Sequence, residues 1–363
     1  MHLVLYRKYR PKSFKEVINQ KNAILSLANA LKEGRISHAY LFSGPRGTGK
    51  TTVARLLAKA LNCQNRKENE FEPCNQCDSC LAINKGSSLD LIEIDAASNR
   101  GIDDIRALKE NVKFPPASSK YKVFIIDEAH QITKDAFNAL LKTLEEPPPY
   151  IIFILATTEP EKLPLTILSR VERYDFKKLS LDDIIGRLKY ICENEKIKYE
   201  EEALRLIATY SEGGLRDAES LLGQIALITS NNITKESVEE LIGAINLEKI
   251  KRYIDILIKK DKEKAISFIN EIYDNGYDLE VFNKEVVNYL RKLLLLKISP
   301  SLASVLEKET TEEELSILFK QAQIIEFPYL EKILRRLIEV QNQMKRSPLP
   351  ILNLELFISE ELI

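Results

Sequence analysis

The feature that most constrains this chain is a glycine-rich run that ends in Lys-Thr. Gly44-Pro45-Arg46-Gly47-Thr48-Gly49-Lys50-Thr51 matches the pattern G-x-x-x-x-G-K-[ST] in full. The apolar run Ala39–Ser43 precedes it, and residues Thr51–Asn62 after it have the apolar spacing of a helix. A strand, a tight turn and a helix in this order surround a phosphate group with backbone N–H groups and a helix N-terminus. We therefore expect all eight residues to bind a nucleotide, with Lys50 reaching its β- and γ-phosphates and Thr51 ligating magnesium.

Two acidic residues follow a second apolar run, Val123–Ile126. Asp127 is placed to hold magnesium together with Thr51, and Glu128 to polarise the water that attacks the γ-phosphate. Neighbouring acids at the end of a strand are also typical of a solvated helix cap. Combined with the complete phosphate loop, however, Asp127 and Glu128 favour nucleotide hydrolysis over binding alone.

The first half of the chain alternates short apolar runs with helical stretches. Runs of this kind are typical of strands in a parallel sheet buried between two helix layers, and the alternation indicates βαβ units. We expect strands at Ala39–Ser43, Leu89–Asp95, Lys122–Asp127 and Ile151–Thr157.

Beyond this region the pattern becomes helical. Short segments interrupted by Gly213-Gly214 and Asn231-Asn232 are followed by a long stretch rich in Leu, Ile, Lys and Glu. Residues Ile250–Leu257 and Tyr329–Met344 carry apolar side chains three and four positions apart. We therefore expect an α/β nucleotide domain at 1–178, a small helical domain at 179–244 and an all-α domain at 245–363.

The charge balance excludes a protein that holds nucleic acid through a global positive field. The 53 Lys and Arg residues are matched by 54 Asp and Glu residues, so that the net charge is −1. Any contact with DNA would therefore need a local basic surface. No run approaches the roughly 18 apolar residues that span a bilayer, and the first residues lack the apolar core of a secretory signal. We expect a cytoplasmic protein that does not contact a membrane.

Four of the five cysteines are spaced for a metal ion. Cys74, Cys77 and Cys80 follow one another at intervals of three, and Cys63 lies eleven residues upstream. Four thiolates in one loop-rich insertion, about residues 62–86, predict a closed structural zinc site. An iron–sulfur cluster is an alternative, although the C-x₃-C-P continuation of ferredoxins is missing; reduced free thiols are another. We expect Cys192 to be a core residue.

The acidic residues also begin a block that resembles a known family. Asp127–His130, Phe137–Pro148, Leu155–Thr158 and Ser169-Arg170 are similar to the AAA+ clamp-loader ATPases. The cysteine insertion narrows the resemblance to the gamma/tau subunits of bacterial DNA polymerase III. It implies a P-loop AAA+ domain, a helical lid domain and a C-terminal helical collar that joins subunits.

The resemblance implies further roles in the nucleotide site. Thr158 would be the sensor-1 residue near the γ-phosphate, and Arg216 the sensor-2 arginine that the lid carries onto the nucleotide. Arg170 would be the arginine finger, acting in trans on the ATP of a neighbouring subunit. Residues Tyr6 to Pro11 resemble the segment that packs near the adenine. The isolated subunit would then hydrolyse ATP poorly.

Two positions depart from the family pattern. Val171 follows the Ser-Arg pair where the family usually has cysteine, and Gly223 stands before Gln224 where it often has aspartate. Neither position is expected to take part in the chemistry. Nothing in the chain resembles the C-terminal extensions of the longer family form.

The implied function is that of a motor subunit that uses ATP, with Mg²⁺, to open a sliding clamp and load it onto primed DNA. The implied partners are other clamp-loader subunits in an assembly like a heteropentamer, the clamp, and primer-template DNA. Contacts to DNA phosphates would come from residues such as Arg100 and Lys142. The chain shows no polymerase motif.

Two other classes fit part of the sequence. One is a different AAA+ DNA machine, such as a branch-migration motor or a eukaryotic-type small clamp-loader subunit, which the cysteine insertion disfavours. The other is a non-hydrolysing scaffold subunit, which the complete set of Lys50, Thr51, Asp127 and Glu128 disfavours.

Overall fold

The computed structural model describes residues 4–67, 69–99, 101–242, 247–306, 310 and 312–362. The chain forms two compact units, Met1–Thr234 and Lys235–Ile363. Among the described residues, no helix is both long enough and apolar enough to cross a lipid bilayer.

The first unit is built on a parallel five-stranded sheet with the order β2-β3-β4-β1-β5. Ser43 pairs with Thr157 on one neighbour and with Asp175 on the other, so that the strands end together. The carboxyl ends of β1, β3 and β4 therefore bring the phosphate loop and the acidic pair to one edge. The strands are β1 Ala39–Ser43, β2 Leu91–Asp95, β3 Lys122–Asp127, β4 Ile151–Thr157 and β5 Glu172–Asp175.

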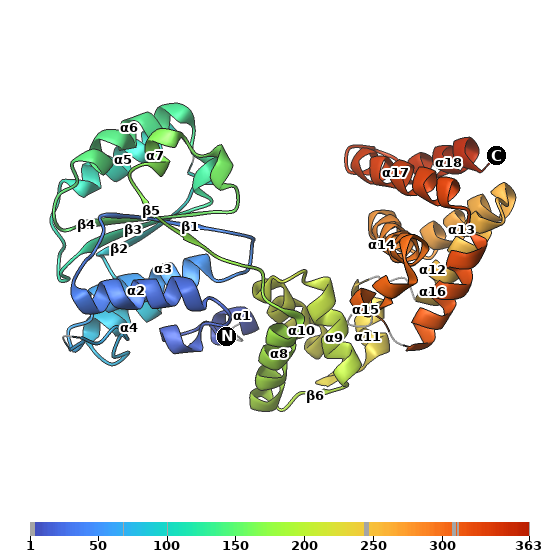
Figure 1. Cartoon of the computed structure of the whole chain (residues 1–363). Coiled ribbons are helices and arrows are strands. Elements are labelled where there is room, and N and C mark those ends of the chain that lie inside the picture. The colour runs from blue at the N-terminus through green and yellow to red at the C-terminus, as the bar shows by residue number, and fades with distance from the viewer. Residues whose placement is uncertain are drawn as a thin grey trace. The chain divides into compact units, whose positions relative to one another are not determined.

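Helices cover both faces of this sheet (Figure 1). Because successive side chains of a strand point to opposite faces, Tyr40 and Phe42 belong to one hydrophobic core and Leu41 to the other. One layer comprises α2 Lys21–Glu33, α3 Lys50–Leu61 and α4 Asp78–Lys85; the other comprises α5 Ile102–Val112, α6 Lys134–Glu145 and α7 Leu165–Leu168. The first unit also contains single-turn 3-10 helices, which are η1 Phe14–Glu16, η2 Ala129–Gln131 and η3 Pro160–Lys162.

Three helices make up the lid region of this unit. The Ser180 hydroxyl accepts from the Asp183 N–H and the Asp183 carboxylate accepts from the Ser180 N–H, which starts the first helix with a capping box. The short N-terminal helix α1, Leu5–Lys8, packs on the last lid helix, where Gly223 leaves room for Leu5. The elements are α8 Leu181–Glu195, α9 Glu201–Tyr210 and α10 Leu215–Ile228, with the short strands β6 Lys198–Tyr199 and β7 Asn232–Ile233.

The second unit is helical in its described part and has one core of its own. Asp261 and Asp278 cap two of its helices by accepting backbone N–H bonds. The expected helical segments Ile250–Leu257 and Tyr329–Met344 lie within α12 and α17. The helices are α11 Lys235–Ile242, α12 Leu247–Ile258, α13 Lys262–Asp274, α14 Leu279–Ile298, α15 Ala303–Leu306, α16 Glu312–Ile324, α17 Phe327–Met344 and α18 Pro350–Glu361, with the 3-10 helix η4 Pro300–Leu302.

The structure corrects two expectations about the strands. The predicted strand Leu89–Asp95 starts at Leu91, because Leu89 and Asp90 form a turn, from which the Asp90 carboxylate accepts the N–H groups of residues 117–119. β2 is also only partly buried, since it lies at an edge of the sheet. The sheet has a fifth strand, β5, that the search for apolar runs missed. The expected boundary at 244/245 lies outside the described residues, and the division into units falls at 234/235.

Candidate nucleotide-binding site

The phosphate loop connects β1 to α3 in a conformation that only glycine adopts easily at several positions. Gly44, Gly47 and Gly49 have φ angles of 144°, 75° and 102°. A Cβ on Gly44 would come within 2.2 Å of the Phe176 carbonyl oxygen. The loop is tied together from within, because the Thr48 hydroxyl donates to the Pro45 carbonyl at 2.8 Å.

Lys50 is the first residue of α3 and is buried. Its Nζ donates to the carbonyl oxygens of Gly44 and Pro45, both at 2.8 Å. Burial lowers the pKa of Lys50, and the carboxylates of Glu128 and Asp127 oppose that shift. The ammonium group thus lies at the base of the loop, beside two acids.

Thr51 and Asp127 meet across the end of the sheet. The Thr51 hydroxyl donates to Asp127 Oδ2 at 2.8 Å, and the Glu128 N–H lies 3.1 Å from Asp127 Oδ1. A hydroxyl and a carboxylate side by side are ligands that suit Mg²⁺. The donor set therefore fits a magnesium ion held between α3 and β3.

Glu128 has a left-handed backbone, with φ 47° and ψ 44°. This conformation is uncommon for a residue with a side chain, and it often marks a functional position. The Thr158 hydroxyl donates to Glu128 Oε2 at 3.1 Å, and His130 Nδ1 lies 3.5 Å from the same atom. His130 also contacts the Thr157 hydroxyl at 3.0 Å, and sequence reasoning had given it no role.

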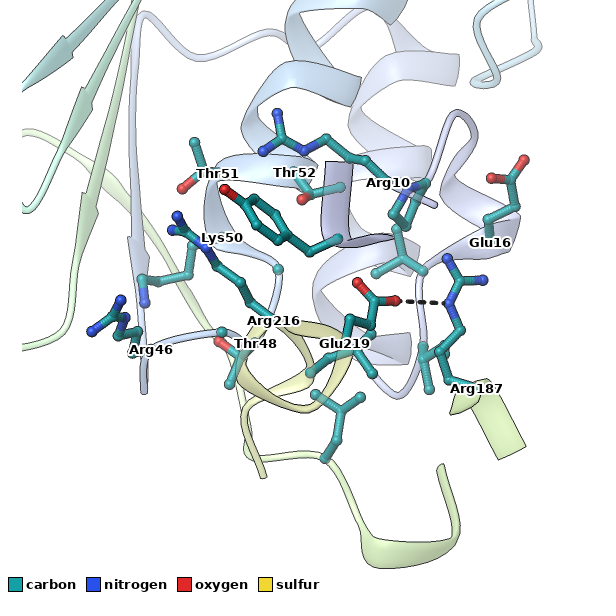
Figure 2. Close-up of a pocket in the computed structure, with 18 of the residues that line it drawn as sticks. Arg10, Glu16, Arg46, Thr48, Lys50, Thr51, Thr52, Arg187, Arg216 and Glu219 are labelled. Carbon is teal, nitrogen blue, oxygen red and sulfur yellow. Dashed lines mark hydrogen bonds and ion pairs between the residues drawn. The ribbon is translucent and has the colours of Figure 1, made fainter. Parts of the chain in front are cut away.

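The phosphate loop and the acidic pair line a pocket that is rich in charged side chains, five cations and four carboxylates (Figure 2). Arg46 to Thr51 of the loop, Asp127 and Glu128 form one side, and Arg216 of α10 lines the pocket from the lid. The Arg216 guanidinium lies 4.9 Å from the centre of the Tyr6 ring. Hydrogen bonding to Arg216 and Arg7 lowers the pKa of Tyr6. The cations that line the pocket are Arg10, Arg46, Lys50, Arg187 and Arg216.

Several of the lining residues were not predicted individually. Arg187 of α8 pairs with Glu219 of α10 at 3.2 Å, and both side chains are largely buried. Burial raises the pKa of Glu219 to about 7, although Arg187 acts in the opposite direction. Arg10, Val17 and Ile18 line the pocket from the N-terminal segment. No sequence motif marks Arg187 or Glu219, because their meeting depends on lid packing.

Five residues predicted to act at the nucleotide or on DNA are absent from the pocket lining: Gly44 and Pro45 at the start of the loop, Thr158, Arg170 and Lys142. Thr158 reaches the site through Glu128. Arg170 is partly exposed, two residues after the end of α7, and donates to Glu145 Oε1 of α6 at 2.6 Å. Lys142 is exposed on α6. Arg100, the other residue expected to contact DNA, lies outside the described residues.

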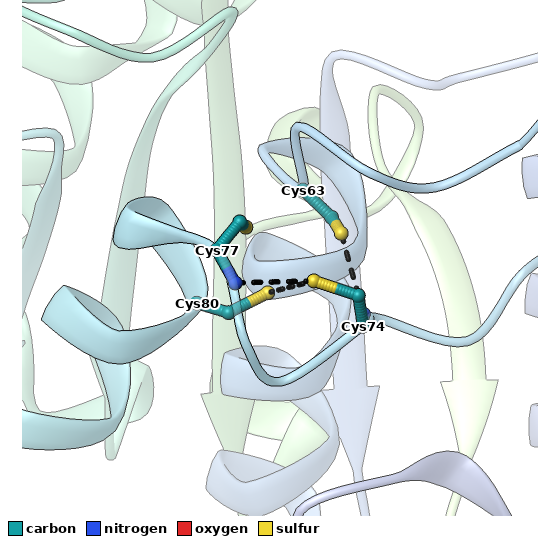
Figure 3. Close-up of side chains that lie close together, drawn as sticks. All are labelled: Cys63, Cys74, Cys77 and Cys80. Carbon is teal, nitrogen blue, oxygen red and sulfur yellow. Dashed lines mark hydrogen bonds between the residues drawn. The ribbon is translucent and has the colours of Figure 1, made fainter.

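The structure brings together the four predicted metal-binding cysteines (Figure 3). The sulfur atoms of Cys63, Cys74, Cys77 and Cys80 all lie within 4.8 Å of one another. Tetrahedral zinc–thiolate bonds of about 2.3 Å place sulfur atoms about 3.8 Å apart, so that small adjustments suffice to accommodate zinc. Cys192 is buried in α8, as expected of a core residue.

The four thiols differ in their electrostatic surroundings. Burial acts to raise the pKa of Cys74, but N–H donation from Gln76 and Cys77 prevails and lowers it to about 6. Burial raises the pKa of Cys80. Backbone N–H groups that point at a thiolate are typical of a zinc knuckle, since they stabilise the ligating form.

Three family models match successive parts of the chain. "DNA polymerase III, delta subunit" matches residues 19–180, and "DNA polymerase III clamp loader subunit, ATPase lid domain" matches residues 183–231. "DNA polymerase III subunits gamma and tau domain III" matches residues 233–359. The DNA polymerase III subunit gamma of Buchnera aphidicola subsp. Schizaphis graminum is 40% identical over 86% of this chain and 85% of its own length. The chain belongs to the DNA polymerase III gamma/tau family.

Membership in this family confirms the expected fold class, a P-loop AAA+ ATPase of the clamp-loader type with a lid and a helical C-terminal region. The subunit tau of Bacillus subtilis is 45% identical over 87% of this chain, which spans 56% of that protein's length. The chain thus spans about half the length of the tau relatives that it matches. Among solved structures, a RuvB Holliday junction branch migration motor from Thermotoga maritima has a TM-score of 0.48 at 20% identity, over 69% of this chain and 79% of its own. A likeness of this degree is no guide to function.

Proposed function

We propose that this gamma/tau family member is the ATP-hydrolysing motor of a clamp loader, which uses ATP to open a sliding clamp and load it onto primed DNA. The observation that carries the proposal is the convergence of Lys50, Thr51, Asp127 and Glu128 on one pocket. A scaffold subunit without ATPase activity has no need of this complete set.

Each residue of the set has a distinct part in the reaction. Lys50 would exchange its bonds to the loop carbonyls for bonds to the β- and γ-phosphates, alongside the loop N–H groups from Arg46 to Thr51. Thr51 and Asp127 would hold Mg²⁺, which supplies charge neutralisation at the phosphates. Glu128 would accept a hydrogen bond from the attacking water and orient it.

Three further residues would couple hydrolysis to the state of the assembly. Thr158 contacts Glu128 and would couple the position of that side chain to the presence of the γ-phosphate. Arg216 would contact the phosphates from the lid, and Arg170 would act on the ATP of a neighbouring subunit. The position of Arg170 outside its own pocket lining supports a role in trans, since a finger must be available to another active site.

The remaining assignments follow from the family and the cysteine cluster. Zn²⁺ would occupy the site of Cys63, Cys74, Cys77 and Cys80 and order the insertion. The partners would be other clamp-loader subunits, the sliding clamp and the phosphates of primer-template DNA, with Lys142 and Arg100 as candidate contacts. Residues 245–363 would form the collar that joins the subunits, and the complex would work in the cytoplasm.

The deciding experiment is steady-state ATP hydrolysis by the chain with clamp-loader partners, with and without clamp and primed DNA. We expect clamp and primed DNA together to stimulate turnover strongly, and Arg170→Ala to abolish the stimulation. An ATP hydrolysis rate that is the same with and without clamp and primed DNA would be consistent with an ATPase but would contradict the role in clamp loading. Unaltered clamp loading by a Lys50→Ala chain would instead contradict the role as a motor.

A further inference from the structure

One wall of the nucleotide pocket is formed by a segment with little regular secondary structure. Arg10, Pro11, Glu16, Val17 and Ile18 line the pocket from the segment between α1 and α2. The regular element in this segment is η1, which has three residues. A single 3-10 turn leaves most of its backbone N–H groups without partners in its own helix, so the wall must be held by other parts of the chain.

The cysteine insertion supplies these partners through Glu72. Its two carboxylate oxygens accept the N–H groups of Phe14 and Lys15 at 2.8 and 3.0 Å, at the start of η1. The neighbouring Phe71 ring lies 6.0 Å from the buried ring of Phe14. Phe71 and Glu72 both lie between Cys63 and Cys74, in the loop that metal binding would close.

A buried lysine makes the second connection. Lys59 of α3 is 2% exposed, and its Nζ donates to Asn75 Oδ1 at 2.7 Å and to Asn84 Oδ1 at 2.9 Å. Its third bond, also 2.9 Å, goes to the carbonyl of Lys12 in the pocket wall segment. Asn75 lies between two of the clustered cysteines, and Asn84 is on α4. All three donors of the ammonium group are therefore used to join the insertion, the phosphate-loop helix and the wall.

We infer that the cysteine insertion is a brace for the nucleotide pocket, with Glu72 and Lys59 as positioning residues that couple metal binding to nucleotide affinity. The inference rests on the proposed nucleotide and zinc sites and adds a link between them. When the metal fixes Cys63 and Cys74, Glu72 holds η1, and η1 in turn holds Val17 and Ile18 against the pocket. The link must act in both directions, so that bound nucleotide raises the affinity for the metal by the same factor.

The test measures ADP binding by calorimetry with the zinc-loaded full chain. We expect Glu72→Ala to raise the Kd for ADP about five-fold or more while one zinc per chain is retained. The matched control is Glu70→Ala, because Glu70 is an exposed acid in the same loop and its side chain has no contact with η1 among the described hydrogen bonds. Glu70→Ala should bind ADP as the unaltered chain does.

A second measurement on the unaltered chain covers the case in which Glu72→Ala does not fold. A chelator should remove less zinc at equilibrium when ADP is saturating, and removal of zinc should speed amide hydrogen exchange at Phe14 and Lys15. Equal ADP affinity of Glu72→Ala and the unaltered chain, or the same zinc affinity with and without ADP, would overturn the inference. If the unaltered chain does not bind ADP at all, the proposed function fails, and the inference fails with it.

Discussion

The Thr51 hydroxyl donates a hydrogen bond to Asp127 Oδ2 at 2.8 Å, which joins the start of the phosphate-loop helix to the end of a central strand. Both groups are magnesium ligands by type, so the bond is expected to open when the ion binds. Asp127→Asn should therefore leave nucleotide binding without magnesium nearly unchanged. It should lower magnesium-dependent ATP hydrolysis by about 100-fold or more, measured as turnover against Mg²⁺ concentration. Full turnover at ordinary Mg²⁺ levels would contradict this role.

Glu128→Gln keeps the size of the side chain but removes the carboxylate that would orient the attacking water. We expect ATP to bind as tightly as before and hydrolysis to fall about 100-fold or more. Thr158→Val should give a smaller loss, because Glu128 loses its hydrogen bond from the Thr158 hydroxyl at 3.1 Å but keeps its charge. Equilibrium binding measures the affinity for ATP, and single-turnover kinetics measures the hydrolysis step, so that effects on the two can be separated. Weaker binding in Glu128→Gln would point to a role in affinity.

Arg170 would complete the active site of a neighbour. A complex containing only Arg170→Ala chains, or only Lys50→Ala chains, should hydrolyse ATP slowly. A mixed complex should recover part of the activity, because a site with intact Lys50 can then receive Arg170 from the next subunit. Arg173→Ala is a suitable control, since this exposed arginine pairs with Asp175 of its own strand. Mixed complexes no more active than either parent would exclude action in trans.

The sequence predicts those parts of the site whose residues are neighbours in the chain, and not those that depend on contacts between distant segments. The phosphate loop and Asp127 follow from contiguous motifs, and their strands were predicted because burial on both faces makes them continuous apolar runs. β5 was missed because Glu172, Arg173 and Asp175 are exposed at the sheet edge, which leaves Tyr174 as its buried residue. The pair of Arg187 and Glu219 could not be predicted, because only the packing of α8 on α10 brings these residues together. Strand order has the same origin, since it depends on contacts between segments far apart in sequence.

The cysteine cluster predicts a metal-dependent and pH-dependent stability. Zinc binds thiolates, so its retention should weaken as the pH falls and the cysteines take up protons. Cys77→Ser should release zinc to a chelator much faster than the unaltered chain does, whereas Cys192→Ser should not, because Cys192 lies in α8 and not in the cluster. Metal content and release are measured with a colorimetric zinc indicator. Equal release from both variants would contradict the assignment of the site.

Asp90 offers a prediction about folding alone. Its buried carboxylate accepts the N–H groups of Ala117, Ser118 and Ser119 at 2.6–2.9 Å. Burial acts to raise the pKa of Asp90, but these donors prevail and lower it. The carboxylate of Asp90 therefore contributes to the free energy of unfolding above the pKa that Asp has in the unfolded chain, about 3.9. This contribution is lost as the pH falls through the lower pKa that Asp90 has in the folded protein. Asp90→Ala should destabilise the first unit by about 2–3 kcal/mol at pH 7 in urea unfolding, and by less in strong acid.

The lid meets the phosphate loop at two facing glycines. The Leu215 N–H donates to the Gly47 carbonyl at 3.1 Å, and a Cβ on Gly47 would lie 2.9 Å from the Gly214 Cα. Gly214 has a φ of −95°, which any residue can adopt, so a side chain there is limited by the space in front of it and not by its backbone. Its Cβ would lie 3.3 Å from the Arg46 carbonyl oxygen of the loop, and 3.0 and 3.2 Å from Asp217 Oδ2 and the Ser211 carbonyl oxygen of the lid. Alanine, valine and leucine at position 214 would therefore crowd the phosphate loop and the turn before α10 to an increasing extent. Substitutions at this one position would thus change the separation of the lid and the phosphate loop. Every side chain proposed to contact the nucleotide would keep its chemical identity.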